Sequence, residues 1–309
     1  METMNKFDPA IKALAQTYTT TNIIKNYKET IQTFAGFWPL SRKFTTEEKI
    51  ILDILENGTG NLTPSERMMA LRILQTPYHN SGKIEGCHSC DSSAHGCDFC
   101  GKMRELAKTN PLIICKYCYD WALEEERSNV GPRHALNLLI LKTIEFTEAE
   151  LASLPINGLL RGNSAGDTDN LTQAMNQLKI AATHPRVDCA LWAKNTPPIT
   201  RAADIYGKPE NLKLIQSSPI IGTVAPLARH FDHTFTVYPT KEATIAAILA
   251  GANACNGKKC GDCGYRCYRS EENGGWEKGT NIAEYLRIKD KAVRAAIVAA
   301  YEAECRKAA

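Results

Sequence analysis

The feature that most constrains the fold is a regular alternation of apolar runs and helical patterns in the second half of the chain. Four short apolar or alternating runs lie in "INGLLRGNSAGD", "VDCALWAKN", "NLKLIQSSPI" and "HTFTVYPT". A helical pattern, "DNLTQAMNQLKIAATHP", lies between the first two, and "KEATIAAILAG" follows the last. Strand followed by helix, repeated, predicts parallel β-α units. We therefore predict an α/β fold with a partial parallel (β/α) barrel at its core.

Polar residues follow each of these runs. In parallel sheets the functional groups gather at the carboxyl ends of the strands. The residues at these ends are therefore candidates for a binding or catalytic site. They are Asn163, Ser164, Ala165, Gly166 and Asp167 after the first run, Lys194 and Asn195 after the second, Ser217 and Ser218 after the third, and Tyr238 and Pro239 after the last.

The 309 residues suffice for one large domain or two modest ones. We divide the chain into an N-terminal helical region, an α/β core that carries a cysteine-rich loop, and a C-terminal cysteine cluster with a closing helix. These regions are residues 1–80, 81–250 and 251–309.

Two capping-box patterns support the helical region. Thr45 with Glu48, and Thr63 with Glu66, have the Thr-x-x-Glu spacing that begins helices. Pro64 suits a first helical position. Helix ends are expected at Gly58 and Pro77, which are common terminators.

Two further helices are expected outside the alternating region. One runs from about residue 119 to 154 and is broken near Gly131 and Pro132. The other covers 281–305, where apolar residues recur at helical steps and predict one buried face. That face consists of Ile282, Leu286, Val293, Ile297 and Tyr301.

Composition and charge bound the class of protein. Hydrophobic residues make up 43% and charged residues 23% of the chain, as in ordinary globular proteins. A net charge of +3 is too small to favour nucleic acid or an acidic membrane as partner. We find no apolar core of a signal peptide and no stretch of the roughly 18 apolar residues that span a membrane. We therefore expect a cytoplasmic protein without membrane contact, in which the 12 cysteines are reduced metal ligands or redox groups.

The first cysteine group lies in "CDFCGKMRELAKTNPLIICKYCYD", residues 97–120. A Cys-x-x-Cys turn brings two thiolates to one metal. Cys97, Cys100, Cys115 and Cys118 would make a four-cysteine zinc ribbon. Alternatively, Cys100, Cys115 and Cys118 supply three ligands to a four-iron cluster and leave one iron open for chemistry.

The second group is "CNGKKCGDCGYRC", with Cys255, Cys260, Cys263 and Cys267. Its first three cysteines have the spacing of plant-type ferredoxins, and its last three that of bacterial ferredoxins. Thiolates without histidine suit iron–sulfur or zinc. The close spacing favours an iron–sulfur cluster over zinc.

A third pair, Cys87 and Cys90, precedes these groups and could form a separate zinc site with Cys97 and with His88 or His95. Two other cysteines have no such spacing. Cys189 lies in a predicted strand and Cys305 on a predicted helix, and we expect both to be plain thiols.

The motif "CKYC" resembles the Cys-x-aromatic-Cys ending of radical S-adenosylmethionine enzymes, although Pro111 stands where that family has its usual first cysteine. Cys100 would replace that first cysteine through a longer gap. The resemblance implies a catalytic [4Fe-4S] cluster on the loop after the first strand of a partial (β/α) barrel. S-adenosylmethionine would bind the open iron, and a reductase or flavodoxin would donate the electron.

The same resemblance implies roles for the loop after the "LLRG" run. Gly166 and Asp167 would replace the family's Gly-Glu-like motif, and Asn163 and Ser164 would help to position the cofactor. The C-terminal cysteines would carry an auxiliary cluster. Two residues have simpler alternatives: Asp167 could cap the next helix, and Lys194 could bind an anion or only face water.

The chain also resembles an uncharacterised family of phage and prophage gene products. The shared segments run from "HNSGKIEG" through "FCGKM", "ICKYCY", "RGNSAGD" and "ALWAKN" to "CNGKKCGDC". This resemblance implies a mobile-element origin and leaves the substrate open, whether nucleotide, nucleic acid, peptide or small metabolite. Two alternative hypotheses are a non-enzymatic zinc protein that presents an interaction surface and an iron–sulfur carrier or sensor.

Overall fold

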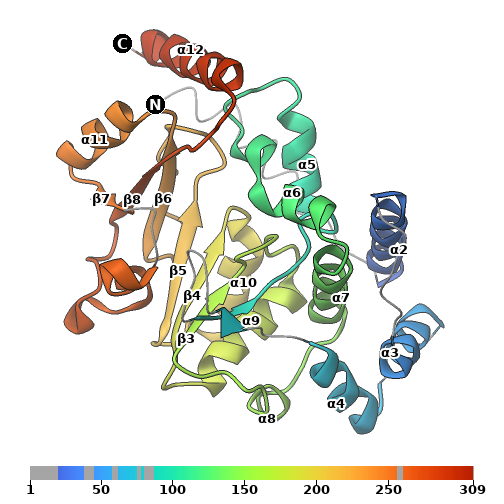
Figure 1. The fold of residues 1–309 in the computed structure, drawn as a ribbon. Coiled ribbons are helices and arrows are strands. Elements are labelled where there is room, and N and C mark those ends of the chain that lie inside the picture. The colour runs from blue at the N-terminus through green and yellow to red at the C-terminus, as the bar shows by residue number, and fades with distance from the viewer. Residues whose placement is uncertain are drawn as a thin grey trace.

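The computed structural model describes residues 20–37, 45–57, 62–74, 78–79, 87–255 and 260–308. Its centre is one sheet, with helices on one face and the C-terminal cysteine segment on the other (Figure 1). Among the described helices, none is long and apolar enough to cross a membrane.

Within the described residues, the sheet has eight strands in the order β1-β2-β3-β4-β5-β6-β8-β7. Only β1 runs antiparallel to its neighbour, and the pairings from β2 onward are parallel. The strands are β1 (Tyr78–His79), β2 (Cys87–Cys90), β3 (Leu159–Gly162), β4 (Asp188–Ala193), β5 (Leu212–Ser217), β6 (His233–Tyr238), β7 (Asn253–Ala254) and β8 (Asn281–Tyr285). The prediction of an α/β fold with a parallel sheet is therefore confirmed, and the four predicted apolar runs are β3 to β6.

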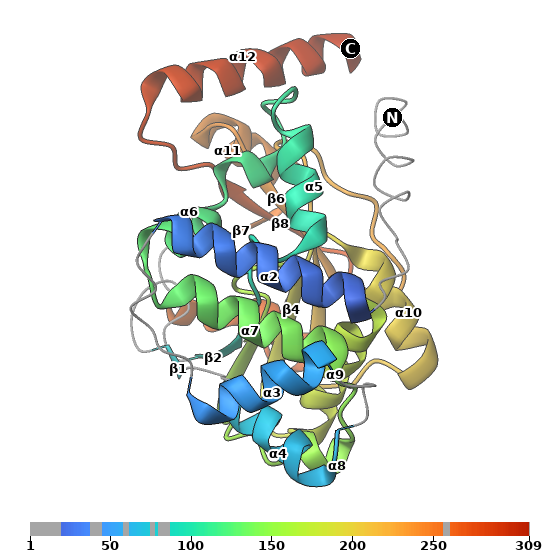
Figure 2. The same cartoon turned by 90° about the vertical axis from the view of Figure 1, so that its right-hand side faces the viewer.

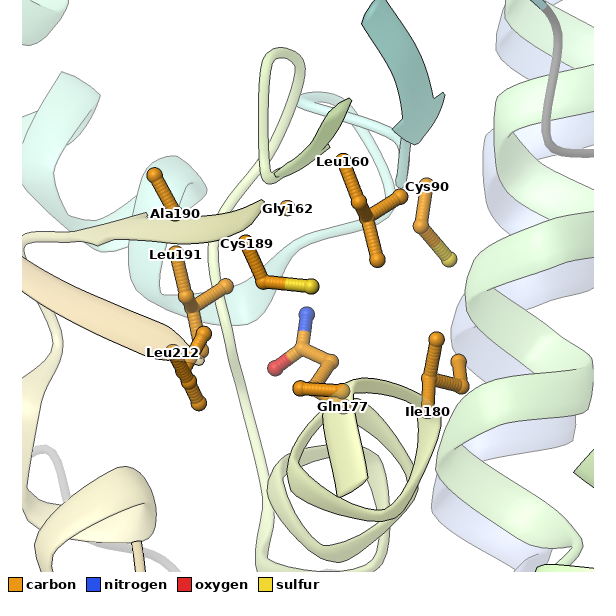
Figure 3. A pocket seen from close by; sticks show the side chains of 10 residues that line it. Cys90, Leu160, Gly162, Gln177, Ile180, Cys189, Ala190, Leu191 and Leu212 are labelled. Atoms are coloured by element: carbon orange, nitrogen blue, oxygen red, sulfur yellow. The ribbon is translucent and has the colours of Figure 1, made fainter. Parts of the chain in front are cut away.

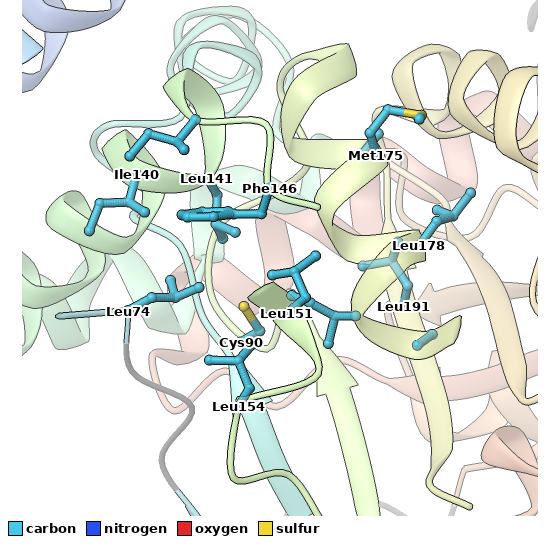
Figure 4. Close-up of a cluster of buried hydrophobic side chains, with 14 of the residues drawn as sticks. Leu74, Cys90, Ile140, Leu141, Phe146, Leu151, Leu154, Met175, Leu178 and Leu191 are labelled. Carbon is cyan, nitrogen blue, oxygen red and sulfur yellow. The ribbon is translucent and has the colours of Figure 1, made fainter. Parts of the chain in front are cut away.

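Helices cover one face of this sheet. The side chains of each strand alternate between the two faces, so every second side chain points towards these helices. Leu160 and Leu191 face α9 (Leu171–Thr183) and α10 (Thr196–Tyr206) in the main core. The helix α7 (Val130–Thr143) extends this core with Ile140 and Leu141, and Phe146 and Leu151 fill the space below it (Figure 4). The two predicted helical patterns near residues 170 and 245 correspond to α9 and to α11 (Lys241–Leu249).

An outer helical layer precedes the sheet, as predicted. It consists of α2 (Thr20–Phe37), α3 (Thr46–Asn57) and α4 (Pro64–Ile73), which lie outside α7 (Figure 2). Both capping boxes are confirmed: the Thr63 side chain accepts from the Glu66 N–H, and Thr45 pairs reciprocally with Glu48. The expected terminators Gly58 and Pro77 lie outside the described residues.

The predicted long helix of 119–154 is three helices. They are α6 (Tyr119–Glu126), α7 and α8 (Glu148–Leu151). The break comes before Gly131 and Pro132, which lie in the first turn of α7, where proline is tolerated. Gly131 is required there because a Cβ would approach the Phe34 ring to 2.7 Å.

The predicted helix of 281–305 is wrong at its start. Residues 281–285 form β8, which inserts between β6 and β7, and the helix α12 covers Lys291–Ala308. Ile282 therefore packs on the sheet, while Val293, Ile297 and Tyr301 do form one docked face on Leu112 and Ile221. The five residues of β8 are too few to distinguish the two-residue period of a strand from the 3.6-residue period of a helix, so the sequence did not reveal this strand.

The other face of the sheet is covered by the C-terminal segment. Cys267 and Tyr268 pack on Ala190, Ile215 and Ile282. The segment contains the short 3-10 helices η3 (Cys260–Cys263), η4 (Arg266–Tyr268) and η5 (Glu271–Asn273). The boundary between the core and the C-terminal region, placed after residue 250, therefore divides a single sheet, because β7 and β8 belong to the same sheet as β2 to β6.

A small void lies between the sheet and α9. Its volume is about 20 Å³, and the thiols of Cys90 and Cys189 point into it from two strands, with Gln177 and Ile180 opposite (Figure 3). The void is mainly apolar, has room for about one water molecule and belongs to the packed core. The expectation of a plain buried thiol at Cys189 agrees with this position.

An ion pair joins α4 to α8 and provides a test of the fold. The Arg67 guanidinium donates to both oxygens of Glu150, at 2.6 and 2.8 Å. This hydrogen bond from Arg67, with that from Thr147, lowers the pKa of Glu150 from 4.5 to about 2. Since the folded-state pKa lies below the unfolded value, the stabilisation is present above pH 4.5 and is lost as the pH falls towards 2.

We predict that Glu150→Gln lowers the free energy of unfolding by about 1–2 kcal/mol at neutral pH. Urea unfolding of both proteins at pH 6 and at about pH 3.5 checks this, and the difference should shrink at the lower pH. An equal difference at both values would show that the Glu150 charge contributes nothing.

Candidate functional site

The predicted cysteine loop connects β2 to the rest of the chain and lies at the carboxyl ends of the strands. It contains α5 (Asp98–Leu106), the 3-10 helix η2 (Ile114–Tyr117) and α6. Cys97 is the N-cap of α5, and its sulfur accepts from the Cys100 N–H at 3.2 Å. Cys118 is the N-cap residue of α6. Each Cys-x-x-Cys pair thus spans a tight turn beside a helical segment.

The loop is fixed to the next strand ends by backbone hydrogen bonds. Ile113 forms an antiparallel bridge with Ile220, and the Ile114 N–H donates to the Pro219 carbonyl at 2.9 Å. The Ile221 N–H donates to the Leu112 carbonyl at 2.8 Å. The segment just before Cys115 is therefore anchored to the loop after β5.

Three predicted ligands lie near one lysine. Lys194 follows β4, and the thiols of Cys115, Cys100 and Cys118 are all among its electrostatic neighbours, together with Asp167. Burial alone would lower the pKa of Lys194, but these groups outweigh it and raise the pKa. The side chain is half-buried, so the simpler expectation of a lysine that only faces water does not describe it.

The three cysteines are protonated thiols in this environment. A hydrogen bond to Cys97, and burial, raise the pKa of Cys100 well above its usual range. Burial raises the pKa of Cys115, and it raises that of Cys118 to about 11. Without a metal they would stay neutral at pH 7 and unreactive, because the thiolate is the ligand and the nucleophile.

Asp167 neither caps α9 nor lies open to solvent. Its oxygens accept from the backbone N–H groups of Lys194 at 2.9 Å, Asn195 at 3.4 Å and Thr168 at 2.8 Å. The N-cap of α9 is Asn170. Burial raises the pKa of Asp167 to about 6, although Lys194 opposes the shift. Asp167 therefore fixes the start of the segment that carries Lys194.

Asn163 and Ser164 are committed to the fold. The Asn163 amide donates to Thr168 Oγ1 at 2.8 Å and to the Trp192 carbonyl at 3.1 Å, and its oxygen accepts from Gln177 at 2.8 Å. The Ser164 hydroxyl donates to Asp91. Their predicted role in holding a cofactor is therefore limited to shaping the loop.

Gly166 is required by a close approach. Its φ is +70°, a left-handed value, and a Cβ at this position would collide with Ser92 in the loop after β2. The Ser92 N–H and hydroxyl both donate to the Ala165 carbonyl, at 3.2 and 3.3 Å. The predicted cofactor loop and the cysteine loop are thus packed backbone to backbone.

A buried carboxylate, Asp169, holds the start of α5. It accepts from the N–H groups of Asp98 and Phe99 at 3.0 and 3.1 Å and from the Cys97 thiol at 3.3 Å. The Lys142 ammonium pairs with it at 2.9 Å and with Asp98 at 3.0 Å. Burial would lower the pKa of Lys142, but these two carboxylates raise it.

A second buried carboxylate, Glu124, holds the loop between β2 and α5. It accepts from the backbone of Ala94 and His95 at 3.0 Å each, and from the rings of His95 at 2.8 Å and His134 at 3.0 Å. Burial would raise the pKa of Glu124, but the hydrogen bonds from His134 and His95 lower it. His95 is thus engaged by a carboxylate and not by the cysteines.

Sequence reasoning missed two acidic residues beside the thiols. Asp91 follows β2, and Asp120 comes two residues after Cys118. Burial, with Asp91 and Glu124 nearby, raises the pKa of Asp120 well above its usual range. In each case the sequence signal was position. Asp91 comes directly after a strand, and Asp120 is the last residue of the "CYD" motif.

Arg161 lies between the two cysteine groups. It extends from β3 on the face opposite the helices, 4.7 Å above the Trp192 ring. Burial would lower its pKa, but Tyr268, Tyr119, Cys260 and Cys267 raise it. It makes no ion pair within 4.0 Å in the described part of the chain.

The C-terminal cysteines gather under the sheet. Burial raises the pKa of Cys267, and Cys260, Cys263 and Cys255 all add to the shift. The Cys263 sulfur contacts the Cys260 carbonyl at 3.2 Å. The four predicted ligands of the second group are therefore neighbours.

Cys87 and Cys90 do not form the predicted pair. They are the two ends of β2 and face opposite sides of the sheet, since side chains alternate along a strand. Cys90 lies in the helix-covered core, while Cys87 contacts Tyr268 at 3.9 Å and has Cys260 as an electrostatic neighbour. Cys97 is held by Asp169, so the structure does not bring these three thiols together.

The donor sets fit a thiophilic metal or cluster by their chemistry. Each group contains several soft sulfur ligands on turns, and each has a cation close by, Lys194 or Arg161, that would balance thiolate charge. Within the described ranges, no three His, Cys, Asp or Glu side chains are already arranged as ligands of one metal ion. Metal binding would therefore require the thiols to move from these positions.

In comparisons with known proteins, no family model, no curated protein and no solved structure matches the chain. The site is therefore interpreted from its own geometry.

The Asp169–Lys142 pair tests how the cysteine loop is held. We predict that Asp169→Asn lowers the free energy of unfolding by about 3 kcal/mol, because it leaves the buried Lys142 with one carboxylate and weakens the start of α5. Urea denaturation measures the change. Asp98→Asn serves as the control: its side chain is 26% exposed, and it should cost less. Equal losses would show that the pair with Asp169 is not special.

Proposed function

We propose that this protein is an iron–sulfur enzyme of the radical S-adenosylmethionine type. Cys100, Cys115 and Cys118 would hold a four-iron cluster, and the C-terminal cysteines an auxiliary one. The observation that carries the proposal is the gathering of the first three thiols around Lys194 at the carboxyl ends of parallel strands. When bound, the cluster would supply one electron to cleave S-adenosylmethionine and so give a 5′-deoxyadenosyl radical.

The sheet topology supports the partial-barrel interpretation. From β2 to β6 the strands follow one another in chain order, and β8 comes next. This is the connectivity of a (β/α) barrel that is not closed. The cysteine loop follows β2, the first parallel strand, and the Gly166–Asp167 loop follows β3. Their order agrees with that implied by the resemblance.

The side chains around the thiols would bind, orient and shield the reactants. Lys194 would balance the charge of the thiolates, and Asp167 fixes its backbone. Asn163, Ser164 and Gly166 shape the loop that would face the cofactor. Burial, with Asp91 and Glu124 nearby, raises the pKa of Asp120, which favours its protonated, hydrogen-bond-donating form there. Substrate would lie on the sheet face that carries Arg161 and Trp192, between the cysteine groups.

We predict that protein purified without oxygen is brown and contains iron and acid-labile sulfide, up to about eight of each per chain if both groups carry [4Fe-4S] clusters. After reduction with dithionite, it should convert S-adenosylmethionine to 5′-deoxyadenosine and methionine. Chromatography of the products measures the reaction. A colourless protein with stoichiometric zinc would contradict the proposal.

Cysteine variants localise the reactive cluster. Cys115→Ala should lose about half of the iron and all 5′-deoxyadenosine formation, because only one cluster has an open iron. Cys305→Ala is the matched control, since its thiol is exposed on α12 and belongs to neither group. Loss of iron in the Cys305 variant would show that the content reflects non-specific binding.

A second candidate is a zinc protein without enzymatic activity, and one observation favours it. The Cys97 sulfur contacts Cys100, so a fourth thiol adjoins the three proposed ligands. Cys97→Ser distinguishes the two candidates. A four-cysteine zinc site should lose its metal in this variant, whereas a three-cysteine cluster should keep its iron.

A further inference from the structure

A cleft of about 710 Å³ opens at the end of the sheet opposite the cysteine loop. Lys213 from the start of β5 and His233 from the start of β6 line it, and the segment before β8 contributes Trp276 and Lys278. None of these residues takes part in the proposed reaction. The cleft is large enough for a small organic ligand.

His233 lies at the base of this cleft and makes no side-chain hydrogen bond in the described chain. The side chain is 1% exposed, and neither ring nitrogen has a partner at full hydrogen-bond geometry, although the Glu277 backbone lies near enough to raise its pKa. Burial lowers its pKa, although Asp232 opposes the shift, so the ring is neutral at pH 7 with one donor and one acceptor. Buried polar groups are nearly always paired, so an unpaired ring in the wall of a cleft indicates a ligand.

Three ammonium groups, those of Lys208, Lys213 and Lys278, lie near His233, and the carboxylates of Asp232, Glu271 and Glu272 also line the cleft. Asp232 is occupied by the Lys208 ammonium at 2.6 Å and by the Leu214 N–H at 2.8 Å. Burial lowers the pKa of Lys208, and repulsion from Lys213 and Lys278 adds to the shift, so the three ammonium groups are close together. Lys213 and Lys278 form no ion pair in the part of the chain described. These two unneutralised charges favour an anion.

The other residues that line the cleft indicate which further groups a ligand would carry. The Trp276 ring lies edge-on to His233, with centroids 6.3 Å apart, and is half-buried, so a flat ring can stack on it. Glu271 and Glu272 line the cleft from η5 and are exposed. Their carboxylates accept hydrogen bonds from hydroxyl or amino groups and repel further negative charge.

We propose that this cleft binds a nucleoside monophosphate. The phosphoryl group would lie between Lys213 and Lys278 and hydrogen-bond to His233, the base would stack on Trp276, and the sugar hydroxyls would donate to the glutamates. One phosphate suits this cleft better than three, because the carboxylates of Glu271 and Glu272 repel further negative charge.

Calorimetric titration of the full-length protein with AMP, adenosine, inorganic phosphate and ATP at low salt tests this proposal. AMP should bind at least tenfold more tightly than each of the other three, and Lys213→Met and Lys278→Met should each weaken AMP about tenfold. Lys289→Met is the matched control, because Lys289 is exposed and outside the cleft, and it should bind AMP like the wild type.

Three results would overturn the proposal. They are no binding of AMP by folded protein at millimolar concentration, undiminished binding in both cleft lysine variants, and binding of inorganic phosphate or ATP as tight as that of AMP. Thermal melting of each variant verifies folding. The titration is repeated with Cys115→Ala, and equal AMP affinity is expected there, so this proposal and the proposed radical function succeed or fail separately.

Discussion

Buried carboxylates that accept hydrogen bonds from backbone N–H groups hold the functional edge of this protein together. Asp167 and Asp169 come from one loop after β3. The first fixes the segment that carries Lys194, and the second fixes the start of α5 beside Cys97. Glu124 does the same for the loop after β2. A buried charge is costly unless it is fully paired. These contacts therefore specify the positions of the loops, and the loops in turn fix the positions of the cysteines that they carry.

The strands β3 to β6 and the capping boxes could be predicted because their signals are local: alternation, apolar runs and Thr-x-x-Glu spacing. β2 was missed because "CHSC" has no apolar pattern, and its cysteines suggested a metal turn. β8 was taken for helix because five residues fit either period. Lys194 and Asp167 were found from their positions at strand ends, whereas the bonds that occupy Asn163 and Ser164 are long-range and leave no trace in sequence spacing.

The two cysteine groups lie on different sides of one cation. Arg161 has Tyr119 and Asp120 as neighbours towards the first group, and Cys260 and Cys267 towards the second. Both groups would become more negative on binding metal, and a guanidinium between them remains charged at any relevant pH. On the sheet face between the groups, Arg161 would therefore balance the charge of both groups close to the proposed substrate.

The docking of α12 affects the first cysteine group, which lies far from this helix in the sequence. Ile297 and Tyr301 press on Leu112, Ile221 and Gly222, and these residues anchor the segment before Cys115. The last helix acts as a brace behind the first cysteine group. Shortening this helix, or fusing a bulky partner to it, would loosen the position of the Cys115 thiol, about 190 residues upstream in the chain, without altering that residue.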